Sequence, residues 1–111
     1  MNNLEEEIYQ IVDVVVECCV VECENGKITK SDVLSKSKKE NATIARYMLT
    51  YHLRQFGLSN TTISQLIGCS IQSVKNMLLN HEIWLQNSRA YRIANSQVIL
   101  KLNARNLQDI R

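Results

Sequence analysis

Carboxamide and hydroxyl side chains recur at helical spacing between residues 70 and 80; they are Gln72, Ser73, Asn76 and Asn80, with Lys75 beside them. The carboxamide of Gln or Asn can form a bidentate pair of hydrogen bonds with adenine, which contributes about 1–3 kcal/mol of discrimination. A lysine ammonium more readily meets a phosphate group. This set therefore predicts contacts with duplex DNA, and the alternative is a polar, solvated helix face with no ligand.

A helix-turn-helix would position this set, because the chain meets the three requirements of that motif. Two helices that cross around a tight turn need a small residue where they approach, which is Ser64. They also need a residue that tolerates positive φ at the turn, which is Gly68, and an apolar anchor in the second helix, which is Val74. Ser70 then begins the second helix, whose first residues would reach base edges in the major groove. The remaining inward positions are expected to be filled by Ile63, Ile67, Ile71 and Met77.

A basic segment precedes this motif. Lys36, Lys38 and Lys39 lie in a polar stretch without apolar anchors, and Arg46 follows in the next expected helix. Neutralisation of phosphates dominates non-specific affinity for DNA, with a salt slope of about −0.9 per contact. The segment is thus a candidate phosphate clamp, although a charged loop on an ordinary surface would have the same composition.

The net charge of +2 conceals two oppositely charged regions. Residues 1–24 hold seven acidic and no basic side chains, a charge of −7, and the rest of the chain carries +9. Such a split favours a polyanion partner for the basic part, although two solvated faces that offset each other would give the same sum. The acidic segment could also fold against the basic surface and mask it.

We expect no enzymatic activity, cofactor or metal ion. His52 and His81 fall on apolar helical stripes, which favours core residues over ligands or bases. No C-x-x-C pair of a zinc site occurs, so the cysteines are interpreted as small buried hydrophobes, which fits a reducing cytoplasm. Trp84 is interpreted as a core anchor rather than a platform for base stacking. The four cysteines are Cys18, Cys19, Cys23 and Cys69.

Apolar periodicity predicts an all-α fold, a compact bundle of about six helices that contains the helix-turn-helix. A polar loop is expected at 35–41 and a frayed tail at 104–111. Residues 11–21 are rich in β-branched side chains and could instead form a buried strand. The expected helices cover residues 4–23, 30–35, 42–56, 61–67, 71–84 and 89–103.

Length and composition limit the remaining choices. The 111 residues suit a single domain spanning 1–111. With 3 Gly and no Pro, the chain lacks the turn residues that sandwiches and barrels require. No apolar run reaches about 18 residues, so we expect no membrane span. The acidic start of the chain differs from a basic secretory signal, and we expect a cytoplasmic protein.

Three stretches together resemble a known family: Ile28 to Lys36 (ITKSDVLSK), then the basic loop and Ile44 to Leu53 (IARYMLTYHL), then the helix-turn-helix. In this order, over roughly residues 8–102, they resemble the C-terminal DNA-binding domain of the bacterial replication initiator DnaA. That domain belongs to an all-helical superfamily shared with the tryptophan repressor. The DVLSK stretch is the most specific part, and residues 28–102 form the region most like the family.

The resemblance implies that Lys36, Lys38, Lys39 and Arg46 contact the DNA backbone, and that Gln72 and Ser73 read bases in the major groove. The chain keeps the glycine and valine of the family's recognition-helix signature but lacks its Asp-His-Thr-Thr element. It also has no G-x-x-x-x-G-K-[ST] loop and no room for an ATPase domain, so it is not an initiator by itself. We expect a stand-alone relative that acts in replication, in transcription regulation or in a mobile element.

The main alternative is a protein-interaction module that does not bind DNA. Its binding surface would be the acidic, apolar helix at the N-terminal end, presented to a partner or to a second copy of the chain. Repressor-type helix-turn-helix proteins often dimerise, whereas the initiator's domain binds as a monomer. The sequence therefore leaves both monomer and homodimer open.

Overall fold

The computed structural model describes residues 4–19, 30–34 and 40–107, which contain six helices and no strand. The expected all-α bundle is therefore confirmed. The end of the helix expected to reach residue 23 and most of the loop expected at 35–41 lie outside the described residues. The helices are α1 (Leu4–Cys18), α2 (Lys30–Val33), α3 (Glu40–Phe56), α4 (Asn60–Ile67), α5 (Ile71–Asn87) and α6 (Arg89–Ala104).

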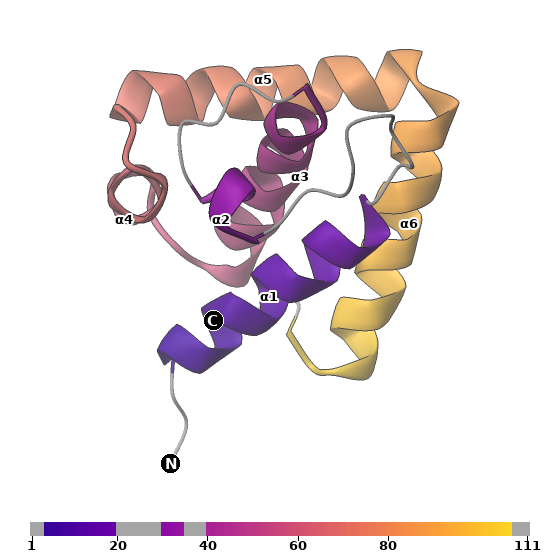
Figure 1. The fold of residues 1–111 in the computed structure, drawn as a ribbon, viewed down its shortest axis with the longest axis horizontal. Coiled ribbons are helices and arrows are strands. Elements are labelled where there is room, and N and C mark those ends of the chain that lie inside the picture. Colours follow the sequence, from indigo (N-terminus) through magenta and orange to yellow (C-terminus); the bar gives the residue numbers. More distant parts are fainter. Residues whose placement is uncertain (1–3, 20–29, 35–39, 108–111) are drawn as a thin grey trace.

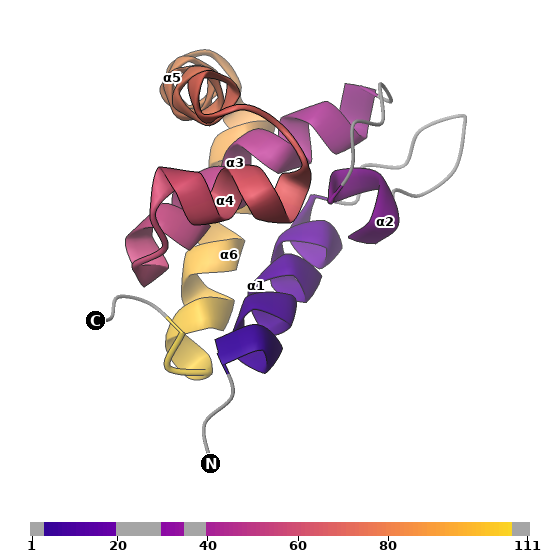
Figure 2. The ribbon, with the colours of Figure 1, turned by 90° about the vertical axis from the view of Figure 1, so that its left-hand side faces the viewer.

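Helix α3 lies at the centre of the bundle, and α1, α2, α4 and α5 each pack against it. Helix α6 packs against α1 and α5. Figure 1 shows α5 along the top and α1 along the bottom with α3 between them, and Figure 2 shows the same order from the side. Helices α1 and α5 therefore occupy opposite sides of the molecule. The radius of gyration is 13.0 Å, close to the value of about 13 Å for a compact chain of similar length.

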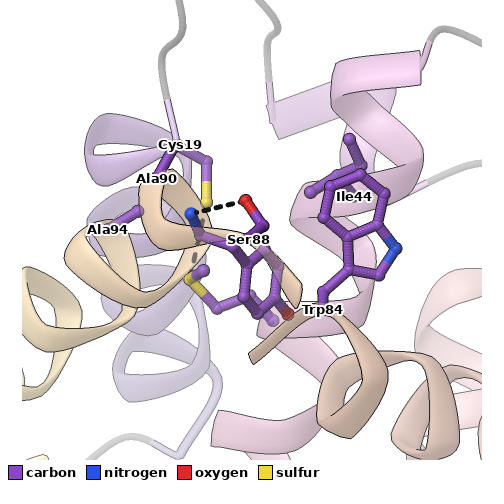
Figure 3. A pocket seen from close by; sticks show the side chains of 8 residues that line it. Cys19, Ile44, Trp84, Ser88, Ala90 and Ala94 are labelled. Atoms are coloured by element: carbon purple, nitrogen blue, oxygen red, sulfur yellow. Dashed lines mark hydrogen bonds between the residues drawn. The ribbon is translucent and has the colours of Figure 1, made fainter. Parts of the chain in front are cut away.

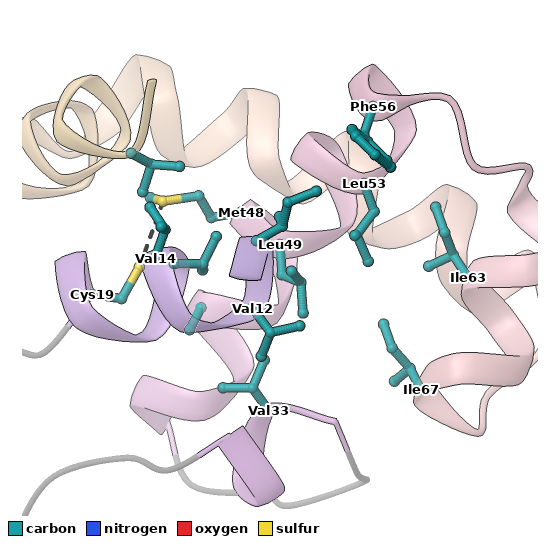
Figure 4. Close-up of a cluster of buried hydrophobic side chains, with 14 of the residues drawn as sticks. Val12, Val14, Cys19, Val33, Met48, Leu49, Leu53, Phe56, Ile63 and Ile67 are labelled. Atoms are coloured by element: carbon teal, nitrogen blue, oxygen red, sulfur yellow. Dashed lines mark hydrogen bonds between the residues drawn. The ribbon is translucent and has the colours of Figure 1, made fainter. Parts of the chain in front are cut away.

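The apolar side of α3 forms much of the core. Met48, Leu49 and Leu53 are fully buried and Phe56 is 2% exposed. In Figure 4 these side chains lie between those of α1, such as Val12, and those of α4. Complete burial of one such side chain contributes about 1.5–3 kcal/mol, so this contact holds the helices on either side of α3 in place.

The β-branched stretch in α1 is helical, so the strand alternative is wrong over Leu4–Cys18. One isoleucine and three valines of this stretch are buried because α1 lies against α2, α3 and α6, which requires apolar side chains over a wide arc of the helix. This part of α1 therefore belongs to the core. Two large apolar residues of α1 remain exposed, Leu4 and Tyr9. The fully buried residues of α1 are Ile11, Val12, Val14 and Val15.

Serine side chains fix the beginnings of three helices. The Oγ atoms of Ser59, Ser70 and Ser88 each accept a hydrogen bond of 3.0–3.1 Å from the backbone N–H three residues later. Each bond satisfies an N–H group that has no partner inside its helix. The Ser88 N–H also donates to the Trp84 carbonyl at 2.9 Å. As a result α5 continues to Asn87, beyond its expected end at residue 84, and α6 follows directly.

The frayed tail expected from residue 104 is wrong for residues 105–107. The Leu107 N–H donates to the Leu102 carbonyl at 2.8 Å, and the Leu107 side chain is 4% exposed. Asn106 permits this turn by adopting φ +56°, a conformation that asparagine tolerates better than most residues. An apolar anchor after the helix therefore keeps this part of the chain folded. Residues 108–111 lie outside the described residues.

Both histidines are core residues, as the sequence predicts. His52 is 4% exposed, and its Nε2 atom lies 2.7 Å from Oδ1 of Asn95. His81 is fully buried, and its Nδ1 atom lies 2.6 Å from the hydroxyl oxygen of Tyr91. The ring of Tyr51 stacks on His81 at a centroid distance of 4.2 Å. These contacts join α3, α5 and α6.

We expect the free energy of unfolding to decrease as the pH falls from about 6.5 to about 4. Burial lowers the pKa of His81 from 6.5 to about 4, and burial also lowers the pKa of His52. The unfolded chain therefore binds protons in this range that the folded chain does not, and protonation favours unfolding. Nε2 of His81 has no hydrogen-bond partner among the described residues, so none of them stabilises the imidazolium there.

Urea denaturation at a series of pH values measures this dependence. The His81→Gln variant removes one titrating group and keeps a polar side chain, so its stability should depend less on pH over the same range. The same pH dependence in the variant and the wild type would contradict the assignment to His81.

Candidate nucleic-acid interface

Helices α4 and α5 are crossed and are joined by the three residues 68–70, here called the α4–α5 turn. Figure 1 shows α4 end-on and α5 along its length, and the perpendicular view in Figure 2 shows the reverse. Gly68 has φ +83°, and its N–H donates to the Ser64 carbonyl at 2.8 Å. A Cβ added at Gly68 would meet no atom within 4 Å, so the backbone conformation alone favours glycine at this turn.

The inward positions expected for this pair of helices are filled with one exception. Ser64 is 6% exposed and Val74 is fully buried, and Ile63, Ile67 and Met77 are also buried. The inward position expected for Ile71 is wrong, because that side chain is 42% exposed. At about 100° per residue, Ile71 lies roughly 90° around α5 from the middle of the face formed by Val74, Met77 and His81.

The first turns of α5 project polar side chains away from the bundle. Gln72, Lys75 and Asn76 are all exposed, so the structure brings three of the predicted contact residues together on one face. The Gln72 Nε2 atom donates to Oδ1 of Asn76 at 3.2 Å. Asn80, one turn further along, donates to the Asn76 backbone carbonyl at 3.0 Å. The carboxamides of Gln72 and Asn76 therefore act as a linked pair.

Ser73 is placed differently from the other predicted base contacts. Its side chain is half-buried, its N–H donates to the Ser70 Oγ, and its own Oγ accepts a hydrogen bond from Ser70 at 3.0 Å. Ser73 is therefore tied to the N-terminal cap of α5. Two exposed apolar residues were not predicted on this helix, Leu79 at 64% and Ile83 at 53%. The sequence spacing could have predicted their exposure, since residues seven and eleven positions after the exposed Gln72 return to the same side of a helix.

Arg46 is separated from this face and buried. Its side chain is 8% exposed; Nε donates to the Val33 carbonyl at 2.9 Å and Nη2 to the Asp32 carbonyl at 2.8 Å. The last carbonyls of a helix lack intrahelical partners, and Arg46 supplies donors at the end of α2. Burial lowers the pKa of the guanidinium, whereas nearby Cys69 and Tyr47 raise it. Arg46 therefore links the end of α2 to a point near the α4–α5 turn.

The predicted backbone contacts Lys36, Lys38 and Lys39 lie outside the described residues. The residues just before this segment belong to the described part of the chain. The Val33 carbonyl accepts a hydrogen bond from Arg46, and the Arg46 guanidinium interacts electrostatically with Cys69 in the α4–α5 turn. The end of α2, which precedes the basic segment in the sequence, thus lies near the turn that precedes α5. This proximity was not evident from the sequence, where Val33 and Cys69 are far apart.

The acidic residues of α1 do not cover the outer face of α5, because the two helices lie on opposite sides of α3 (Figures 1 and 2). One acidic side chain of α1, Glu17, instead forms an ion pair with Lys101 of α6. The hydrogen bond from Lys101 lowers the pKa of Glu17 below its usual value. Glu22 and Glu24 lie outside the described residues. The Glu17–Lys101 ion pair joins α1 to α6, away from the first turns of α5.

A small apolar pocket opens where α3, α5 and α6 meet the end of α1 (Figure 3). The buried thiol of Cys19 donates to the Met48 sulfur at 3.5 Å, and burial raises the pKa of Cys19 to about 12. This thiol therefore stays protonated at neutral pH and is not a nucleophile. Trp84 is half-buried and packs at a tilt against Tyr91, with ring centroids 5.9 Å apart. The pocket is lined by Cys19, Ile44, Met48, Trp84, Ser88, Ala90, Tyr91 and Ala94.

The chain matches no protein-family model, no curated protein and no solved structure. Within residues 4–19, 30–34 and 40–107, no group of three or more His, Cys, Asp or Glu side chains is arranged to hold a metal ion. Over the same ranges, none of the helices combines the length and the apolar character that crossing a bilayer requires.

Replacing Arg46 by alanine should lower the free energy of unfolding by about 1–3 kcal/mol, because the carbonyls at the end of α2 lose their donors. Urea denaturation measures this change, and Lys75→Ala, at an exposed position, is a control expected to stay within about 0.5 kcal/mol of the wild type. An Arg46→Ala protein of unchanged stability with weakened DNA binding would contradict the structural role and favour the backbone contact.

Proposed function

We propose that the chain binds double-stranded DNA, with α4 and α5 acting as a helix-turn-helix and the first turns of α5 entering the major groove. The observation that carries the proposal is the outward projection of Gln72, Lys75 and Asn76 from a helix held across α4 by the turn at Gly68. The major groove is about 12 Å wide and admits one α-helix. Helix α5 fits this role because, in the described part of the chain, exposed side chains extend along it from Ile71 to Ile83.

The phosphate contacts of the proposed complex come mainly from the basic segment. Between residues 60 and 87 the charged side chains are Lys75 and Glu82, so this pair of helices carries no net charge. Attraction to the DNA backbone then depends on Lys36, Lys38 and Lys39, which follow the end of α2 that is held near the α4–α5 turn. In this arrangement the lysines supply affinity and α5 supplies base contacts.

The resemblance to the DnaA C-terminal domain supports the same proposal, because it independently assigns phosphate contacts to the basic segment and base contacts to the helix after Gly68. We infer a protein of the bacterial cytoplasm that acts on DNA in replication, transcription regulation or a mobile element. The burial of α1 favours DNA binding over the protein-interaction alternative, since four of the apolar side chains on which that alternative depends belong to the core.

Fluorescence anisotropy with a mixed-sequence duplex, titrated at several salt concentrations, tests the proposal. The Lys36/Lys38/Lys39→Ala variant should bind more weakly. The slope of its log affinity against log salt concentration should be smaller in magnitude by about 2–3, because three phosphate contacts are lost. The Gln72→Ala/Asn76→Ala variant should lose affinity with little change in slope. Gln97→Ala, which removes an exposed carboxamide from α6, is the matched control and should bind like the wild type.

Absence of binding by the folded protein at low salt would overturn the proposal. Equal salt slopes for the wild type and the lysine variant would show that the basic segment makes no phosphate contacts. The masking of the basic surface by acidic residues is better tested by Glu22→Gln/Glu24→Gln than by deletion of residues 1–24, because deletion would expose the core that α1 covers.

A further inference from the structure

We propose that the first turns of α5 select A·T base pairs, reading adenine with the linked carboxamides of Gln72 and Asn76 and the thymine methyl group with Ile71 at the start of the helix. This inference rests on the proposed function, because it requires α5 to enter the major groove. A·T-containing duplexes are the class of DNA sequence that the site would bind.

The hydrogen bond between Gln72 and Asn76 leaves these side chains with a donor and an acceptor that are complementary to adenine. Donation from Gln72 Nε2 to Asn76 Oδ1 leaves the Gln72 oxygen as an acceptor and the Asn76 amide nitrogen as a donor. Adenine presents the complementary pair in the major groove, a donor at N6 and an acceptor at N7. Reversal of both amides would leave one acceptor and one donor as before, so the match does not depend on how the amides are oriented.

Ile71 supplies an exposed apolar side chain at the N-terminal end of α5, roughly 120° around the helix from the middle of the Gln72–Asn76 pair at about 100° per residue. It is the first residue of α5, it is 42% exposed, and it is next to Gln72. The thymine methyl is the apolar group that base pairs present in the major groove, and covering it removes apolar surface from water on both partners. Leu79 is 64% exposed and lies seven residues after Gln72, on the same side of the helix. Along the helix axis the carboxamides are therefore preceded by Ile71 at the start of α5 and followed by Leu79 on their own side.

The first turns of α5 hold few of the side chains that usually read G·C pairs. Guanine is read most often by arginine or lysine and cytosine by a carboxylate. Residues 70–80 contain no Arg, Asp or Glu, and Lys75 is their one charged side chain. At about 100° per residue Lys75 lies roughly 80° around the helix from the middle of the Gln72–Asn76 pair, and a lysine ammonium more readily meets a phosphate group. The chemistry of the face thus favours A·T over G·C.

Competition between duplexes of equal length with randomised A·T-only and G·C-only centres tests this selection. Wild-type protein should prefer the A·T pool about tenfold, the effect of one good base contact. Replacing thymine by uracil removes the methyl group and nothing else, and should weaken wild-type binding several-fold. Ile71→Ala should bind the thymine and uracil duplexes equally, and Gln72→Ala/Asn76→Ala should lose the preference for A·T.

Ile83→Ala is the matched control, because Ile83 is an exposed apolar residue of the same helix about 18 Å from Ile71 at 1.5 Å per residue. It should keep both the A·T preference and the sensitivity to uracil. All substituted side chains are exposed, so circular dichroism should show folded variants.

Each outcome separates this inference from the proposal on which it rests. No binding to either pool would overturn DNA binding itself. Equal binding to both pools would overturn A·T selection and leave DNA binding in place. An A·T preference that persists with uracil and in the carboxamide variant would show reading of the narrow minor groove and would also overturn the inference, because the methyl group lies in the major groove.

Discussion

Burial of the apolar face of α3 is the constraint on which the rest of the molecule depends. Met48, Leu49 and Leu53 have no exposed surface, and α1, α2, α4 and α5 are placed by packing on the same helix. The opposite positions of α1 and α5 follow from this arrangement. The acidic helix therefore lies on one side of the molecule, and the proposed DNA-binding face lies on the other, where it is free of the acidic groups of α1.

The second constraint is the fixation of α5 along its length. The turn at Gly68 and the cap at Ser70 set its beginning, and Ser88 sets its end while starting α6. In the middle, buried His81 bonds to Tyr91 and stacks on Tyr51. A helix held at both ends and at its centre presents its outer side chains at fixed positions, which is what reading of base edges requires. The polar cluster also makes the position of α5 sensitive to acid.

Local signals in the sequence predicted most of the fold. The cap residue Ser70, the glycine at position 68 and helical spacing located the helices to within a few residues, because these signals act within one or two turns. Tertiary contacts decided what the sequence could not predict. The burial of Arg46 depends on where α2 ends, the exposure of Ile71 depends on where α4 lies, and Leu107 is anchored by a core formed elsewhere in the chain.

The most direct test of the account is the mapping of backbone amide chemical shifts by NMR during titration with a short duplex. Entry of α5 into the major groove predicts the largest changes at residues 70–76, smaller changes at the start of α4, and none in Leu4–Cys18. Changes confined to α1, or to the stretch around Leu79 and Ile83 with none at residues 70–76, would contradict it and would indicate a different interface.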